Sequence, residues 1–275
     1  MELMQKIAPL AMVVFVLSSM LAMGLGLTVG GIIGPLRDVR RVVLSLLANF
    51  VLVPLAAVAI AALLQLDKPL GIGLLLLGLA AGAPFLPKLT QLAKGNLAFA
   101  VGLMVLLMVV TVIYLPLVLP LLLSGVSVNS AKIARSLVLL MLLPLAVGLA
   151  SKAWFATAAA RIRSVLERIA NFSLILFTLL LIIVNFRSVL DIFGTRGILA
   201  GLLFIAISFG IGWFLGGPDP DGRRVVALGT AQRNIAAAIV VGGQSFTDPK
   251  VIVMVVVVAI VGLLILMPLS RKLAP

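Results

Sequence analysis

The stretch "GTAQRNIAAA" (residues 229–238) places Arg233 between a glutamine and an asparagine in an otherwise apolar segment. A charge at the centre of a bilayer costs about 2.5–3.5 kcal/mol even on the gentler insertion scales, so it needs a compensating partner. The stretch also contains Gly229 and Thr230, which interrupt the apolar run. Lipid cannot satisfy backbone groups freed by such an interruption. We therefore interpret residues 229–238 as part of a broken transmembrane helix that carries a buried cation.

The composition of the chain indicates a multi-pass membrane protein. Of its 275 residues, 63% are hydrophobic and 11% are charged, whereas soluble domains are about half apolar. The net charge of +13 comes from residues spread through short loops rather than along one stripe, which argues against a nucleic-acid partner. The chain has no Cys and no His, and no nucleophile and base stand in a catalytic pattern. We therefore expect neither an enzyme nor a cofactor-binding protein.

Nine apolar stretches are long enough to cross about 30 Å of hydrocarbon. They lie at 7–27, 42–64, 69–94, 96–124, 134–155, 166–187, 195–216, 222–246 and 249–270. The third contains "AGAPFLPK" (81–88), and the eighth contains the stretch around Arg233. Glycine and proline at these places predict that the third and eighth spans are broken helices.

Basic residues in the flanking loops predict the orientation, because cytoplasmic loops carry an excess of Lys and Arg. One side collects twelve of them: Arg37, Arg40, Arg41, Lys94, Lys152, Arg161, Arg163, Arg168, Arg223, Arg224, Arg271 and Lys272. The other side collects seven: Lys6, Lys68, Lys132, Arg135, Arg187, Arg196 and Lys250. We therefore expect an outside N-terminus and a cytoplasmic C-terminus. The expected location is a cell membrane, specifically a bacterial inner membrane. Trp154, at a span end, is expected to anchor at the interface.

The order of the spans predicts two inverted repeats. The first repeat would cover about 7–124 and the second about 166–272, with the span at 134–155 as the connector. The two broken spans then take equivalent places in the two halves, which points to a transporter with a binding site near the midplane. The predicted fold class is an all-α polytopic membrane protein, with one transporter domain over residues 1–275.

Four stretches resemble corresponding parts of the bile acid:sodium symporter family. They are "MGLGLT" (23–28), "RRVVLSLLANFVLVPL" (40–55), "AKGNLAFAV" (93–101) and "LVLLMLLPLAVGL" (137–149). The resemblance runs in order along nearly the whole chain. It implies a core domain in which two broken helices cross, beside a panel domain, and alternating-access transport of organic anions driven by sodium.

The chain departs from this family at the sodium-binding positions that the resemblance implies. An ungapped alignment places Pro87 at the sodium-binding asparagine, and Ala100 and Met104 at hydroxyl ligands. Gly229 and Arg233 stand at the glutamate and glutamine of the second crossing, whereas Asn49 remains as a possible amide ligand. Alkali cations prefer hard oxygen ligands. We therefore expect no metal site and transport that does not depend on sodium.

The acids lead to the same expectation without the resemblance. All eight fall in loops or at span ends: Glu2, Asp38, Asp67, Glu167, Asp191, Asp219, Asp221 and Asp248. Coupling to protons or sodium commonly uses a carboxylate within the membrane. Two cations lie near the breaks instead, Lys88 and Arg233, although the long side chain of Lys88 could also reach the interface.

The candidate residues of the crossing or substrate site are the polar side chains near the two breaks. They are Asn49, Lys88, Thr90, Gln91, Asn96, Thr230, Gln232, Arg233 and Asn234. The planar guanidinium of Arg233 suits either the freed carbonyls or the carboxylate or sulfate of a solute. Our first hypothesis is a sodium-independent transporter of a small organic anion in which Arg233 replaces bound sodium. The alternatives are a non-transporting receptor or regulatory relative, and an anion channel. The expected partners are the solute and the lipid bilayer; the oligomeric state stays open.

Overall fold

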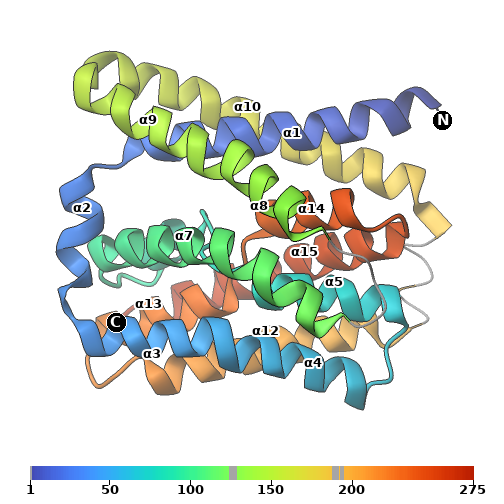
Figure 1. The fold of residues 1–275 in the computed structure, drawn as a ribbon. Helices are drawn as coiled ribbons and strands as arrows, with labels where there is room; N and C mark the ends of the chain where they lie inside the picture. Colours follow the sequence, from blue (N-terminus) through green and yellow to red (C-terminus); the bar gives the residue numbers. More distant parts are fainter. Residues whose placement is uncertain (1, 124–128, 188–191, 193–194) are drawn as a thin grey trace.

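The computed structural model describes residues 2–123, 129–187, 192 and 195–275, and the regular elements within them are helices (Figure 1). In this part of the chain, eight helical runs are long and apolar enough to cross a membrane. They are Lys6–Gly26, Val39–Leu63, Leu97–Leu122, Ser130–Trp154, Ala156–Val184, Gly197–Leu215, Pro220–Ser245 and Pro249–Lys272. Each overlaps a predicted span. The predicted class of an all-helical, multi-pass membrane protein is therefore confirmed.

The third predicted span is divided into two short helices. Helix α5 (Lys68–Leu79) and helix α6 (Leu86–Leu92) are separated by residues 80–85. Helix α5 rises only about 18 Å, which is shorter than the hydrocarbon layer. A ninth crossing made by α5 and α6 together stays a prediction, as do the two inverted repeats.

Three long helices form one layer, at the top of Figure 1. They are α1 (Glu2–Gly26), α9 (Leu143–Trp154) and α10 (Ala156–Val184). Helices α1 and α9 cross at Gly24 and Gly148, where a Cβ on Gly24 would lie 2.2 Å from the carbonyl oxygen of Leu145. Only glycine permits so close an approach of two backbones. The resemblance implies a panel domain, and its assignment to this layer stays a prediction.

The remaining long helices form a second, thicker layer (Figure 1). Besides α5 and α6 it contains α3 (Val39–Leu47), α4 (Val53–Leu63), α7 (Leu97–Leu122), α12 (Gly197–Leu215), α13 (Pro220–Ala231), α14 (Ile235–Ser245) and α15 (Pro249–Lys272). Helix α2 (Val29–Ile33) and the 3-10 turn η1 (Gly34–Arg37) connect the two layers. In an apolar 18-residue stretch of the run Pro220–Ser245, 94% of the residues are buried, against 28% in the corresponding stretch of α10. Helices α13 and α14 are therefore the centre of the thick layer.

Two π-helical turns come directly before prolines within spans. They are η2 (Ala48–Leu52), before Pro54, and η3 (Val138–Leu142), which joins α8 (Ser130–Leu137) to α9 before Pro144. Proline has no N–H to donate to the carbonyl four residues earlier. In η2 that carbonyl belongs to Phe50, and the hydroxyl of Tyr114 on α7 donates to it. The turn η2 also carries Asn49, which it directs into the thick layer as a fully buried side chain.

Candidate functional site at the helix crossing

The break between α5 and α6 is held by backbone geometry and by one threonine. Gly82 has φ +78°, and a Cβ there would lie 2.3 Å from the backbone nitrogen of Met108. Glycine is therefore required both by conformation and by the close approach of α7. The hydroxyl of Thr111 donates to the carbonyl of Ala81 at 3.1 Å and accepts from the amide of Ala81 at 3.0 Å. Thr111 thus satisfies both backbone groups of a residue that lies outside any helix.

The break between α13 and α14 meets the first break through Asn234. The backbone N–H of Asn234 donates to the carbonyl of Ala80 at 2.9 Å, and its side-chain amide donates to the carbonyl of Gly82 at 3.1 Å. The side-chain oxygen of Asn234 accepts from the amide of Ala237 and so caps α14. One asparagine therefore begins a helix and joins the two broken backbones.

Arg233 lies at the centre of this crossing and is only 4% exposed. Its Nε donates to the carbonyl of Leu77 at 2.8 Å and its Nη2 to the carbonyl of Gly78 at 2.7 Å. Its Nη1 donates to the carbonyl of Thr230 at 3.1 Å and to Oδ1 of Asn49 at 2.6 Å. Three of these oxygens belong to the last turns of α5 and α13, where the helix dipoles concentrate negative charge. Of the two partners expected for Arg233, the structure places the broken backbone against it.

Five of the predicted site residues are buried at the crossing, and four lie around α6. Asn49, Thr230, Arg233 and Asn234 are brought together, with the amide of Asn49 donating to the hydroxyl of Thr230 at 3.2 Å. Gln232 is buried and lines a space of about 10 Å³ between α12 and α15, close to the room one water molecule needs.

Four predicted residues lie on or next to α6 and form no hydrogen bond with the side chains of the crossing in the described part of the chain. Lys88, Gln91 and Asn96 are exposed, and Asn96 caps α7 by accepting from the amide of Phe99. The hydroxyl of Thr90 is buried without a hydrogen-bond partner in the described part of the chain. These residues therefore take no part in the contacts made by Arg233.

Two further polar residues of the crossing were not predicted, Thr111 and Tyr114, both on α7. Both stand in the span 96–124, three residues apart and surrounded by apolar neighbours. That isolation could have indicated their role, because hydroxyl groups in transmembrane helices usually form hydrogen bonds with backbone carbonyls or with side chains of other helices. The hydroxyls of Thr111 and Tyr114 bond to carbonyls that the break and Pro54 release.

Four other positions where the resemblance implies sodium ligands carry no side-chain oxygen: Pro87, Ala100, Met104 and Gly229. Ala100 and Met104 are buried, and Pro87 is half-buried. A Cβ on Gly229 would lie 2.9 Å from Cδ2 of Leu86, so a glutamate there would have to displace that leucine. Side chains with no oxygen thus fill the space beside Gly229.

Six of the acids lie at helix ends or on an exposed surface. Asp38, Asp67, Asp219 and Asp248 are N-cap residues, Asp221 is in the first turn of α13, and Glu167 is exposed on α10. Asp191 and the side chain of Glu2 lie outside the described residues. In the part of the chain that is described, no acid approaches Arg233 within ion-pair distance.

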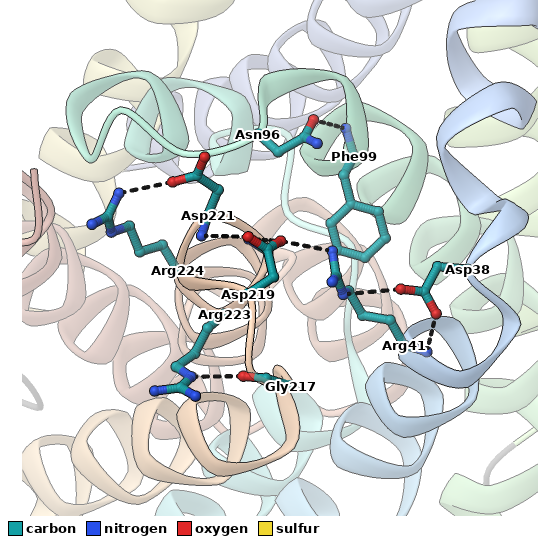
Figure 2. A network of polar contacts seen from close by, with 10 residues as sticks. Asp38, Arg41, Asn96, Phe99, Gly217, Asp219, Asp221, Arg223 and Arg224 are labelled. Atoms are coloured by element: carbon teal, nitrogen blue, oxygen red, sulfur yellow. Dashed lines mark hydrogen bonds and ion pairs between the residues drawn. The ribbon is translucent and has the colours of Figure 1, made fainter. Parts of the chain in front are cut away.

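An ionic network fixes the start of α13 (Figure 2). The guanidinium of Arg41 lies 3.4 Å from Asp38 and 3.2 Å from Asp219, and it stands 5.4 Å from the centre of the Phe99 ring. Asp219 also accepts from the amide of Gly222 and so caps α13. Arg41 therefore ties together the ends of α3, α7 and α13.

A cavity of about 220 Å³ lies between the two layers. Its walls come from α1, α10, α14 and α15, and Asn185, just after α10, is the one polar side chain among the lining residues. The residues are Ala8, Pro9, Met12, Phe177, Leu181, Val184, Asn185, Ile239, Gly243 and Ile252. The cavity suits the apolar body of a small solute.

Comparisons with known proteins agree with this architecture. The model of the sodium bile acid symporter family matches residues 11–195. The chain is also similar to the probable sodium/metabolite cotransporter BASS2, chloroplastic, of Oryza sativa subsp. japonica, with 28% identity over 242 residues. That match covers 85% of this chain and 57% of the relative, so the chain spans little more than half the relative's length. Because the family model covers well over half of the chain, the protein belongs to the sodium bile acid symporter family.

Proposed function

We propose that this protein is a membrane transporter of small organic anions whose cycle does not require sodium. The observation that carries the proposal is the set of four oxygen atoms bound by Arg233. Three backbone carbonyls and an amide oxygen are hard, neutral ligands of the kind that alkali cations accept. The guanidinium of Arg233 among these oxygens supplies a permanent positive charge. A sodium symporter would instead bind and release an ion in each cycle.

The surroundings of Gly229 support the same proposal. Leu86, Leu103 and Met104 are almost completely buried beside the crossing and offer no oxygen for a second ion. The described acids lie at helix ends or on the surface, so no carboxylate is at hand to bind a cation at the crossing. The family and the relative are named for sodium, and this chain would have kept the fold while replacing the ion.

The charged and apolar groups near the crossing and between the layers favour one class of solute. Arg233 uses four of its five N–H donors on the protein, so it is not the main anion ligand. Lys88, exposed on α6 just after the first break, is the other candidate cation and is proposed for that role. The cavity between the layers would hold the apolar part of the solute. Together these features favour a small carboxylate or sulfonate with an apolar body.

Uptake into proteoliposomes tests the proposal. Purified protein is reconstituted, and uptake of a panel of labelled carboxylates and sulfonates is measured with sodium outside and again with choline in its place. We expect equal initial rates, and accumulation that follows the electrochemical gradient of the solute, with no contribution from the sodium gradient. A strict requirement for sodium would contradict the proposal.

A second candidate is a receptor or regulatory relative that binds a solute without transporting it. The close packing around Gly229 and the fixed bonds of Arg233 favour this alternative, because both resist rearrangement. Counterflow separates the two candidates. Exchange of labelled for unlabelled solute across the membrane supports transport, whereas saturable binding without exchange supports the receptor.

A further inference from the structure

The outer face of α10 carries two arginines in line with exposed apolar side chains. Arg161 and Arg168 are seven residues apart and so lie within about 20° of each other around the helix axis. The same stripe continues with Val165, Phe172, Ile175, Leu179 and Ile183, which are 51–67% exposed. The opposite face of α10, including Ala170 and Phe177, is buried against the molecule. In a membrane protein the exposed stripe faces lipid.

The position of the two arginines along α10 corresponds to the edge of the membrane. From Ile169 to Val184 no residue is charged, and this run rises about 24 Å, close to the hydrocarbon thickness. Arg168 therefore lies at the hydrocarbon edge, and Arg161 lies about 10 Å further out, among the headgroups. Trp154 and Phe155, next to the start of α10, are 77% and 66% exposed. Aromatic residues of this kind mark the same interface.

Neither arginine on the stripe has an acidic partner in the described part of the chain. Glu167, the one acid of α10, pairs with Arg163 at 2.7 Å, and both lie well away from the stripe around the helix axis. The two free guanidiniums thus extend outward from an apolar surface. A planar guanidinium can donate two parallel hydrogen bonds to the oxygens of a phosphate group. Each basic residue near an anionic membrane surface also contributes about 1 kcal/mol to the free energy of binding that surface.

We propose that Arg161 and Arg168 bind the phosphate of an acidic phospholipid. Its acyl chains would lie along Val165, Phe172 and Ile175. A lipid is favoured over soluble phosphate because the charged end of the stripe continues directly into an apolar surface of membrane length.

The test compares a double variant with a control on the same helix. Arg161→Gln/Arg168→Gln removes both guanidiniums from the stripe, whereas Arg163→Gln and Arg168→Gln together remove the same charge but leave Arg161. Native mass spectrometry counts the lipids retained from a defined mixture of phosphatidylglycerol and phosphatidylcholine. We expect the wild type to retain phosphatidylglycerol, the control to retain an intermediate amount, and the double variant to lose most of it. Equal retention by the double variant and the wild type, or equal loss in both variants, would overturn the proposal.

Thermal unfolding provides a second readout and distinguishes the source of the phosphate. In nanodiscs, phosphatidylglycerol should raise the unfolding midpoint of the wild type and leave that of the double variant unchanged. Inorganic phosphate, titrated into lipid-depleted protein in detergent, should raise neither. A phosphate-dependent rise that the double variant lacks would assign the site to a soluble anion and contradict the lipid. If the double variant does not fold, Arg161→Lys/Arg168→Lys, which keeps the charges without the planar fork, should bind phosphatidylglycerol more weakly than the wild type.

Discussion

Arg233 joins three separate parts of the thick layer through one side chain. Its four hydrogen bonds reach α5, α13 and the π-turn η2. The sequence was enough to predict that Arg233 lies at a helix break. It also predicted that Arg233 needs a partner, because placing an unpaired charge within a bilayer costs several kcal/mol of free energy. It was not enough to choose between backbone and solute. That choice depends on where the carbonyls of Leu77 and Gly78 point, and those two residues carry no polar side chain as a signal.

Substitution of Arg233 tests its role as an internal cation. Glutamine has two N–H donors, so Arg233→Gln removes at least two of the four hydrogen bonds that Arg233 makes, and we expect a loss of roughly 3 kcal/mol or more in the free energy of unfolding. The unfolding midpoint of the variant should rise in sodium chloride relative to choline chloride, because the freed oxygens can bind sodium. The wild type should show no such difference.

Arg233→Lys is the matched control for this prediction. The ammonium keeps the charge but cannot reach four acceptors from one plane. We expect its stability to lie between that of the wild type and that of Arg233→Gln, with little response to sodium. A glutamine variant as stable as the wild type in choline would show that Arg233 is not central to the crossing.

At the scale of the helices, the breaks were predictable and their supports were only partly so. Gly82, Pro84 and Pro87 forecast the interruption after α5, because they remove helical geometry and donors. Asn234 was predicted as a residue of the crossing from its place beside the second break. The contribution of α7 was missed, because two hydroxyls in a strongly apolar span have no periodic pattern that indicates which helix they face.

The support of the first break by α7 gives a prediction at this scale. Thr111→Val keeps the volume of the side chain and removes both bonds to Ala81, leaving a buried N–H and a buried carbonyl unpaired. We expect a loss of about 2 kcal/mol in the free energy of unfolding. Amide hydrogen exchange should become faster in residues 80–85 in particular. Thr178→Val, on α10 in the other layer, serves as the control, and equal exchange in both variants would contradict the prediction.

At the scale of the whole molecule, one contact between the two layers involves α8, which continues through η3 into α9 of the first layer and packs on α14 of the second. Ser136 on α8 donates there to Oε1 of Gln244. The sequence predicted a panel and a core through the resemblance. It did not predict this contact, because the sequences of α8 and α14 contain no pattern that indicates which helix each packs against. If transport requires the layers to move relative to each other, this contact must open.

A cross-link between the layers tests that requirement. The chain has no cysteine of its own, so Ser136→Cys/Gln244→Cys introduces the only thiols. Bridging them with a short, cleavable thiol reagent should stop solute exchange, and reduction should restore it. The control pair is Leu64→Cys/Arg196→Cys, whose contact lies within the thick layer; bridging it should leave exchange unchanged. Continued exchange with the first pair bridged would exclude relative motion at α8 and α14.

The covalent attachment of the cation at the crossing also has a consequence for membrane voltage. In the proposed cycle a bound ion would leave with the solute, whereas Arg233 would stay with the protein during both the loaded and the empty half. With a monovalent anion bound, the two charges would cancel as the site changes sides, and the empty site would return with one uncompensated positive charge. Moving one charge through the whole field costs about 2.3 kcal/mol per 100 mV. Voltage would then act on the return of the empty carrier rather than on the delivery of its cargo.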